Sequence, residues 1–258
     1  MNKQIRYFMA AAGVALLVMS GKTAVNAQEA VAPVTADQLM AVVNAQCAAV
    51  NSMHETIAET VQMTDTRTGR SVEADMTVDM RENRQVTHMV MAMNLATSGI
   101  SQTVVEESYA SVANGFLSTY VKEPGSGRWE VSHERLSPAQ LVSQANPFAL
   151  SGMDTTGSVV TTDGQVFRFT AALDSNNMAD FVEILGASGL TVKADSFPVT
   201  VEIDAATLLP KSMTVSITGL HGYGNSSIEA SAVSVVTYGE YNQFDTLAIP
   251  PEVIAAVK

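Results

Sequence analysis

The 258-residue sequence is poor in cysteine, tryptophan and positive charge. Its single cysteine, Cys47, cannot form an intramolecular disulfide, so the fold has to be stabilised by its hydrophobic core. Lys and Arg number 14 against 26 Asp and Glu, which gives a formal net charge of −12. A surface of this sign repels phosphate groups, so we expect no nucleic-acid partner and no binding to anionic membrane surfaces.

Long apolar runs are also missing beyond the N-terminus. The apolar run Tyr7–Met19 follows two basic residues and is too short for a membrane-spanning helix, which needs about 20 residues. Together with the small and polar ending Val25–Ala27, it is typical of a secretory signal peptide. We therefore predict a signal peptide over residues 1–27, cleaved near Ala27, and a short tether over 28–34. The expected location is extracytoplasmic, in a bacterial cell envelope, with no transmembrane helix in the mature chain.

Recognisable catalytic and metal motifs are absent as well. Gly-x-Ser-x-Gly does not occur, and the histidines are single residues without metal-ligand spacing. Gly219–Gly224 lacks the lysine of a phosphate-binding loop, and Asp174–Asp180 lacks the glycine and the closing glutamate of a calcium loop. The sequence therefore predicts a protein that is not an enzyme and needs no metal or cofactor. The four residues interpreted as surface or packing histidines are His54, His88, His133 and His221.

What the sequence has in abundance is alternation of apolar and polar residues, which is typical of strands with one dry and one wet face. In Pro198–Ile217, two alternating runs flank a short turn before Pro210, which predicts an antiparallel hairpin. Val86–Thr97 is apolar on both faces and predicts a central strand. Further strands are expected over Ile57–Asp65, Ser71–Arg81, Ile100–Ala110, Phe116–Lys122, Arg128–His133, Gly157–Thr162, Gln165–Leu173 and Ile228–Gln243.

Capping residues predict about three helices. The capping box Thr35–Gln38 opens a helix that ends near Met53, with Cys47 in its apolar stripe as a packing residue. A second helix is expected from Ser137 to about Ala145, and a third over Met178–Ala187. The fold class that fits is α+β: a single large, antiparallel, strongly twisted half-barrel sheet of about 10–11 strands with about three helices on its concave face, in one domain over residues 35–258.

The order of these elements resembles the LolA-like superfamily of periplasmic and surface lipoproteins, in particular an uncharacterised Gram-positive branch related to LppX and LprG. The most specific pieces are Asp204–Lys211 and Tyr238–Val253. The resemblance implies an open half-barrel whose concave face holds a lipid or another apolar molecule. One departure is that Val18–Gly21 is followed by Lys22 where a lipobox has its cysteine, which favours release as a soluble protein.

The residues themselves leave two interpretations of the methionine-rich strands. Flexible, polarisable methionines suit a cavity for varied apolar ligands, but they also fill ordinary cores. We predict that the apolar lining of a ligand site consists of Met76, Val78, Met80, Met89, Met91, Met93, Val201, Ile203, Met213 and Val215. The expected function is a secreted, non-enzymatic carrier or binding protein for a lipid-like molecule. The alternative is an envelope sensor or interaction module that binds a partner protein through the same concave face.

Overall fold

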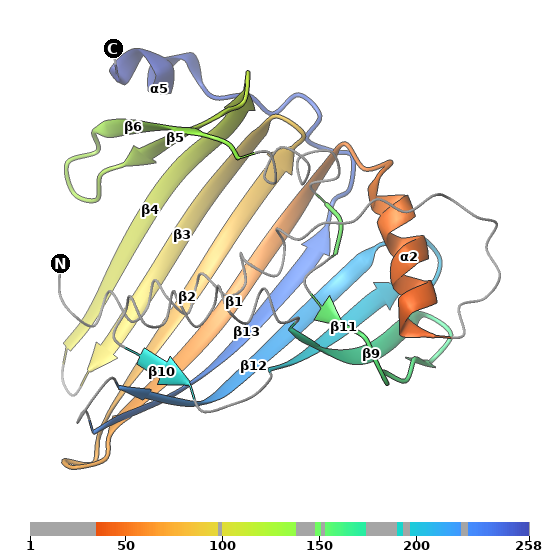
Figure 1. Cartoon of the computed structure of the whole chain (residues 1–258). Coiled ribbons are helices and arrows are strands. Elements are labelled where there is room, and N and C mark those ends of the chain that lie inside the picture. Colours follow the sequence, from red (N-terminus) through yellow and green to blue (C-terminus); the bar gives the residue numbers. More distant parts are fainter. Residues whose placement is uncertain are drawn as a thin grey trace.

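The computed structural model describes residues 35–97, 100–137, 148–150, 153–173, 190–192, 197–222 and 227–257. In these ranges, thirteen strands form one antiparallel sheet (Figure 1). They are accompanied by two helices. The described part of the chain is therefore mostly β, with more strands and fewer helices than the expected α+β fold. The helices predicted to end near Ala145 and over Met178–Ala187 lie outside the described residues.

The first six strands follow one another as a meander, as expected. A hairpin turn predicted from Asn114 and Gly115 joins two of them, and both residues have positive φ, 55° and 79°, as a mirror-image turn requires. The strands are β1 (Ser52–Asp65), β2 (Arg70–Asn83), β3 (Val86–Thr97), β4 (Ile100–Ala113), β5 (Phe116–Lys122) and β6 (Trp129–Arg135).

The second half of the sheet contains the predicted hairpin as β11 (Pro198–Asp204) and β12 (Pro210–Gly222). The last long strand, β13 (Ile228–Gly239), ends before Gln243 because the chain turns through positive φ at Glu240 and Asn242. The strand expected over Gly157–Thr162 is reduced to two residues. The remaining strands are β7 (Met153–Asp154), β8 (Thr161–Thr162), β9 (Val166–Leu173) and β10 (Leu190–Val192).

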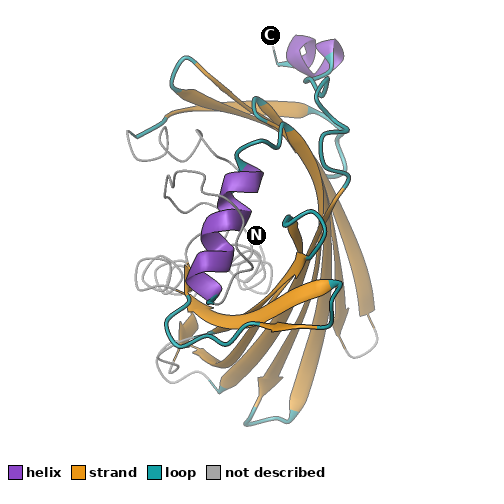
Figure 2. Cartoon of the chain, turned by 90° about the vertical axis from the view of Figure 1, so that its right-hand side faces the viewer, coloured by secondary structure: helices purple, strands orange, loops and turns teal. Residues whose placement is uncertain are grey.

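The two halves meet where β1 pairs with β13. The register runs from His54 opposite Gly239 to Asp65 opposite Ile228, along almost the whole of β1. The main path of the sheet is β6-β5-β4-β3-β2-β1-β13-β12-β11-β9-β7, so β6 and β7 are its two ends and the sheet is open. Figure 2 shows that the sheet curves, so that it has a concave inner face and a convex outer face.

Helix α2 (Ala36–Cys47) lies on the inner face, beside the half of the sheet that contains β9 and β11 (Figures 1 and 2). Its predicted capping box is confirmed: Thr35 Oγ1 accepts from the Gln38 amide at 3.2 Å, and the Thr35 amide donates to Gln38 Oε1 at 3.2 Å. The helix ends at Cys47 and not near Met53, since β1 already begins at Ser52. Cys47 is buried, as expected of a packing residue, and burial raises the pKa of its thiol to about 12.

Helix α5 (Pro251–Ala256) lies outside the curve of the sheet and is not one of the helices expected on the concave face (Figure 2). The segment leading to it is held by Asn83, whose Nδ2 donates to the carbonyl oxygen of Leu247 at 2.9 Å. On the outer face, Phe244 packs edge-on against His54 and lies under the guanidinium of Arg81. Within the helix, Val253 is the buried residue.

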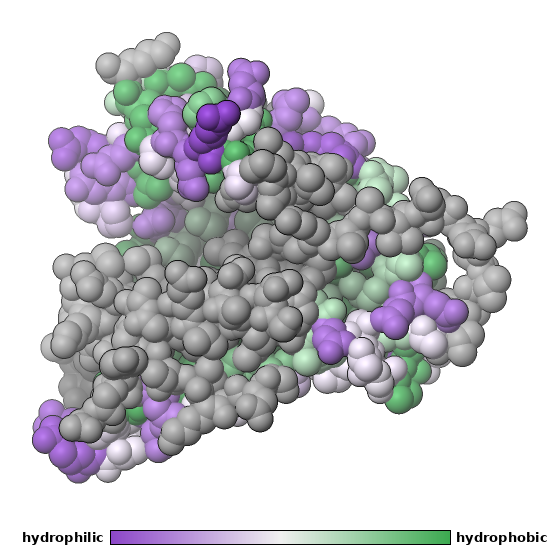
Figure 3. Space-filling view, viewed as in Figure 1, coloured by the Kyte–Doolittle hydropathy of each residue, from purple (hydrophilic) through white to green (hydrophobic). Residues whose placement is uncertain are grey.

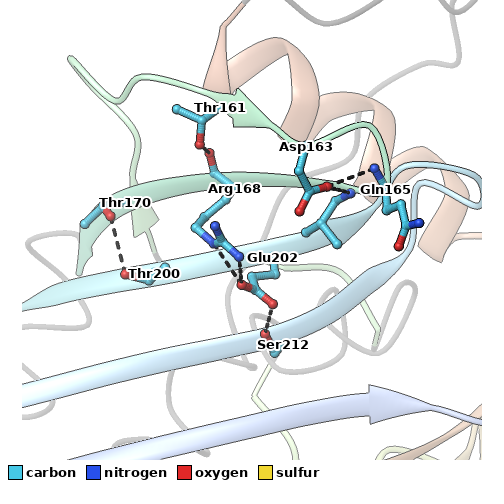
Figure 4. A network of polar contacts seen from close by, with 9 residues as sticks. Thr161, Asp163, Gln165, Arg168, Thr170, Thr200, Glu202 and Ser212 are labelled. Carbon is cyan, nitrogen blue, oxygen red and sulfur yellow. Dashed lines mark hydrogen bonds and ion pairs between the residues drawn. The ribbon is translucent and has the colours of Figure 1, made fainter.

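The outer face of β9, β11 and β12 carries a network of polar contacts (Figure 4). Arg168 Nη2 donates to Glu202 Oε1 at 2.6 Å, and the other oxygen of this carboxylate accepts from Ser212 Oγ at 2.9 Å. These bonds lower the pKa of Glu202, the bond from Arg168 being the largest cause. The network joins the three strands on the side opposite to α2, so this part of the outer face is structural.

The histidines are less isolated than the sequence indicated. The strand pairing places His54 Nε2 3.1 Å from Asp79 Oδ2, and His88 Nε2 3.3 Å from Glu107 Oε1, on the outer face. His88 also stacks on Tyr109, with ring centroids 4.4 Å apart. Within the described ranges, no group of three His, Cys, Asp or Glu side chains could hold a metal ion. No helix in those ranges is long and apolar enough to cross a membrane.

Candidate functional site on the inner face of the sheet

The strand registers place the whole predicted lining on the inner face. Residues directly opposite each other in an antiparallel pair point to the same side. Met76 is opposite Met93, Val78 is opposite Met91 and Met80 is opposite Met89. In the other half of the sheet, Val201 is opposite Met213. All ten residues belong to one hydrophobic cluster or pack against it: Met76, Val78, Met80, Met89, Met91, Met93, Val201, Ile203, Met213 and Val215.

This lining forms two groups, since β1 and β13 separate β2 and β3 from β11 and β12. The group on β11 and β12 is fully buried in the half of the sheet beside α2, whose Leu39 and Val43 are buried with it. The group on β3 is less covered, because Met89 and Met91 are only partly buried. In the space-filling view, green apolar residues are visible in a recess below the β5–β6 edge (Figure 3).

Two buried glutamates, which are not among the predicted lining residues, interrupt this apolar face. Glu55 and Glu59 lie on β1 with their side chains 0% and 2% exposed. They have the same parity along the strand as the buried Ile57 and Val61, so they point inward. Neither oxygen of either carboxyl has a hydrogen-bond partner among the described residues.

The residues opposite these glutamates on β13 are polar and unpartnered too. Tyr238 is opposite Glu55, and Ser234 is opposite Glu59. Both are buried, and neither hydroxyl has a hydrogen-bond partner within the described ranges. Buried polar side chains nearly always have a partner in folded proteins, so two such cross-strand pairs, separated on this face by one apolar pair, are an unusual concentration.

Burial shifts the titration of this group strongly. It raises the pKa of Glu59 to about 8 and the pKa of Glu55 well above the ordinary value, with the negative charge of nearby Glu82 as the second cause for Glu55. It also raises the pKa of Glu82 to about 7, against the opposing effect of a hydrogen bond from Thr87. The pKa of Tyr238 is raised by burial and then by the charge of Glu55. Burial therefore favours the neutral form of Glu55 and Glu59, in which a carboxyl can both donate and accept a hydrogen bond.

The charged side chains described on the inner face around these acids are all negative in sign. The inner-face positions of Met53–Met63 on β1, Val72–Glu82 on β2 and Ala230–Tyr238 on β13 carry three glutamates and no Lys, Arg or His. His54 and Arg81 are opposite each other on the other side of the sheet, where they contact Phe244. At the described inner-face positions of these three strands, every charged side chain is therefore acidic.

A signal for the acids is present in the sequence. Met53, Ile57, Val61 and Met63 alternate in step, and the same period-two pattern assigns positions 55 and 59 to the apolar face. A charged residue on the dry face of a strand is uncommon unless it is paired or functional. Applying the alternation to every position of β1, and not only to its apolar residues, identifies Glu55 and Glu59.

Comparisons with known proteins give a likeness in fold only. No family model matches the chain, and no curated protein sequence matches it. A solved DUF1329 family protein from Desulfovibrio piger is 9% identical, with 79% of this chain and 91% of that chain covered and a TM-score of 0.26. A β-barrel-like protein of the domain of unknown function DUF1849 from Brucella abortus is 11% identical, with 75% and 100% covered and a TM-score of 0.28. Likenesses of this size carry no argument about function.

Proposed function

We propose that this protein is an extracytoplasmic, non-enzymatic binding protein that holds a lipid-like or other apolar molecule against the inner face of its sheet. The observation that carries the proposal is the apolar surface on the concave side of an open sheet, which runs from β3 to β12 and is interrupted by the polar residues of β1 and β13 described above. The resemblance to LolA-like lipid carriers in element order supports the same function.

The methionines of β2 and β3 indicate that this end of the sheet is a surface for a ligand and not a closed hydrophobic core. Met76 and Met93 are buried, whereas their neighbours Met89 and Met91 are only partly covered although they point to the same face. Apolar side chains that stay partly accessible on a concave face can be covered by a guest molecule. Methionine also adapts to different guest shapes, because its side chain is unbranched and flexible.

Burial alone can supply the binding free energy. Each methylene group removed from water contributes about 0.8 kcal/mol, so an alkyl chain of ordinary lipid length binds without any ion pair. Apolar contacts do not require one exact ligand shape. This also suits a carrier, which has to release the molecule that it binds. In this proposal the inner face provides the apolar contact and the outer face, with its polar network and α5, keeps the curvature of the sheet.

The direct test is native mass spectrometry of protein purified from its own host, with organic extraction and identification of whatever is bound. We expect an apolar molecule in stoichiometric amount. Protein emptied by extraction should bind the fluorescent apolar probe N-phenyl-1-naphthylamine saturably, and Met91→Asp should weaken that binding at least tenfold. Val105→Asp, on the exposed outer side of β4, is the matched control. Protein that carries no apolar molecule and does not bind the probe contradicts the proposal.

A further inference from the structure

The inner face contains polar groups that the proposed binding of an apolar molecule does not require. An apolar ligand needs only apolar contacts, yet the middle of the sheet buries Glu55, Glu59, Ser234 and Tyr238 with no hydrogen-bond partner among the described residues. Leaving a buried carboxyl or hydroxyl without a partner is unfavourable, since the group loses its bonds to water and gains none in return. Four such groups lie opposite each other on two paired strands. A ligand with a polar head can supply the hydrogen bonds that they lack.

The arrangement has a defined shape. The pairs Glu55–Tyr238 and Glu59–Ser234 flank the apolar pair Ile57–Val236, all on the same face. Four residues along a strand correspond to about 13 Å, so the polar groups form a short stripe across an otherwise apolar surface. Glu82 lies close enough to Glu55 to raise its pKa, which adds a third acid at one end of the stripe. An apolar chain against Met89 and Met91 on β3 would be separated from this stripe by the apolar inner face of β2.

We infer that the ligand of the inner face is a cationic amphiphile, an apolar molecule whose polar head carries a basic amine that binds to Glu55 or Glu59. The inference rests on the proposed function and deepens it by naming the chemistry of the head group. Three acids, with no Lys, Arg or His at the described inner-face positions of β1, β2 and β13, favour a positive head. An ammonium head gains an opposite charge when a carboxyl loses its proton, whereas a carboxylate or phosphate head finds no positive partner at these positions. Tyr238 is opposite Glu55 and Ser234 is opposite Glu59, so each acid has a hydroxyl beside it that can form a further hydrogen bond to the head.

The protonation of the acids is consistent with this ligand. When an uncharged amine reaches a neutral carboxyl, the proton passes from the carboxyl oxygen to the nitrogen, and an ammonium–carboxylate pair remains. When an ammonium ion binds, the carboxyl proton is released to water. In both cases, charge-assisted hydrogen bonds replace unpartnered buried groups. A hydroxyl head can also hydrogen-bond to these groups, but it gains no charge pairing, so it should bind less tightly.

The test compares three probes with the same alkyl chain: dodecylamine, dodecanol and dodecanoate. Each is titrated against the full chain, emptied of ligand, by displacement of N-phenyl-1-naphthylamine. We expect dodecylamine to bind at least tenfold more tightly than dodecanol, and dodecanoate to bind most weakly. Equal binding of all three contradicts the cationic head while leaving the proposed function intact. Failure of all three, with no probe binding, contradicts both.

Variants locate the amine preference. Glu55→Gln and Glu59→Gln keep the size of each side chain, and each should reduce the preference for dodecylamine over dodecanol at least threefold; the double variant should abolish it. Glu73→Gln, which is exposed on the outer side of β2, should leave the preference unchanged. Circular dichroism verifies that each variant is folded. Should a variant fail to fold, the ranking of the three probes on the unmodified chain still decides. A double variant that keeps the full preference overturns the assignment.

Discussion

Glu55 and Tyr238 are directly opposite each other on β1 and β13, both are buried on the inner face, and neither has a hydrogen-bond partner among the described residues. The pair lies in the central strand pairing that joins the two halves of the sheet. A structural role alone would be served better by two apolar residues, because those require no partner. Substitutions of this pair and of its neighbours therefore test most directly whether the inner face binds a ligand.

The stability of the ligand-free protein should fall as the pH rises from about 5 to about 8. The pKa of Glu59 is about 8 in the folded chain against 4.5 for an ordinary glutamate, so unfolding in this range releases a proton and is favoured by higher pH. Glu82, with a pKa of about 7, acts in the same direction. The expected loss is on the order of 4 kcal/mol, since one pKa unit corresponds to about 1.4 kcal/mol.

At lower pH, surface acids make the stability of the folded protein fall as the pH decreases. Hydrogen bonds lower the pKa values of Asp65, Asp163, Glu202 and Asp204, so the stability that these groups contribute is lost as the pH falls below about 4. Urea unfolding followed by circular dichroism over a pH series should therefore show a maximum between these limits. Stability that increases steadily from pH 5 to pH 8 would show that the buried acids are ionised and paired.

Replacing Glu59 with Gln should stabilise the empty protein at pH 8 by about 1–3 kcal/mol, because a neutral amide of the same size has no ionisation to suppress. The same substitution should flatten the decline between pH 5 and pH 8. Glu73→Gln is the control for loss of a negative charge on an exposed strand position, and it should change stability by less than about 0.5 kcal/mol. A destabilised Glu59→Gln protein would mean that the carboxyl has a partner that the amide cannot replace.

The methionines of the inner face should separate into core and lining residues. Met213→Ala should cost about 2–4 kcal/mol, because Met213 is fully buried and its truncation leaves a cavity. Met91→Ala should cost less than half as much, because Met91 is only partly buried. Met213→Leu, which nearly conserves volume, serves as the control. Urea unfolding at one fixed pH measures all three, and equal losses for Met91 and Met213 would place Met91 in the closed core.

Asn83 should act as the anchor of the C-terminal segment. Its Nδ2 donates to the Leu247 carbonyl, and its Oδ1 accepts from the amides of Gln85 and Val86 at 2.9 and 2.8 Å. Asn83→Ala removes both sets of bonds and should cost about 1–3 kcal/mol. Asn83→Asp keeps the acceptor and loses the donor, so it should speed hydrogen exchange over residues 244–257 while preserving the turn at 84–86. Unchanged exchange in both variants would show that the segment is held by its apolar contacts alone.

The periodicity of the sequence predicts most of the strands because each has one dry face. Phe116–Lys122 matches β5 at both ends, and the Asn114–Gly115 turn is a signal that depends on two residues only. What the sequence does not reveal is which strands become neighbours across long separations. Nothing local in β1 specifies β13 as its partner, so the central pairing was not predicted.

The candidate site was predicted in part, for a related reason. Apolar alternation identifies Met76 and Met93 as inner-face residues, and the structure places them opposite each other. The acids were missed because a glutamate in a strand is ordinarily solvent-exposed. Only the pairing with Tyr238 shows that Glu55 belongs to a shared polar stripe. The position of α5 outside the curve of the sheet was not predicted either, because the pattern of Glu252–Lys258 does not say which side of the sheet a helix there covers.

The pairing of β1 with β13 has a consequence for how the chain is made. Strand β1 is near the start of the domain, but its partner β13 is synthesised almost last. A nascent or truncated chain therefore leaves one edge of β1 unpaired, and this edge can pair with another molecule. Premature termination anywhere before β13 should therefore yield aggregates and not a smaller folded unit, and completion of translation becomes a condition for solubility.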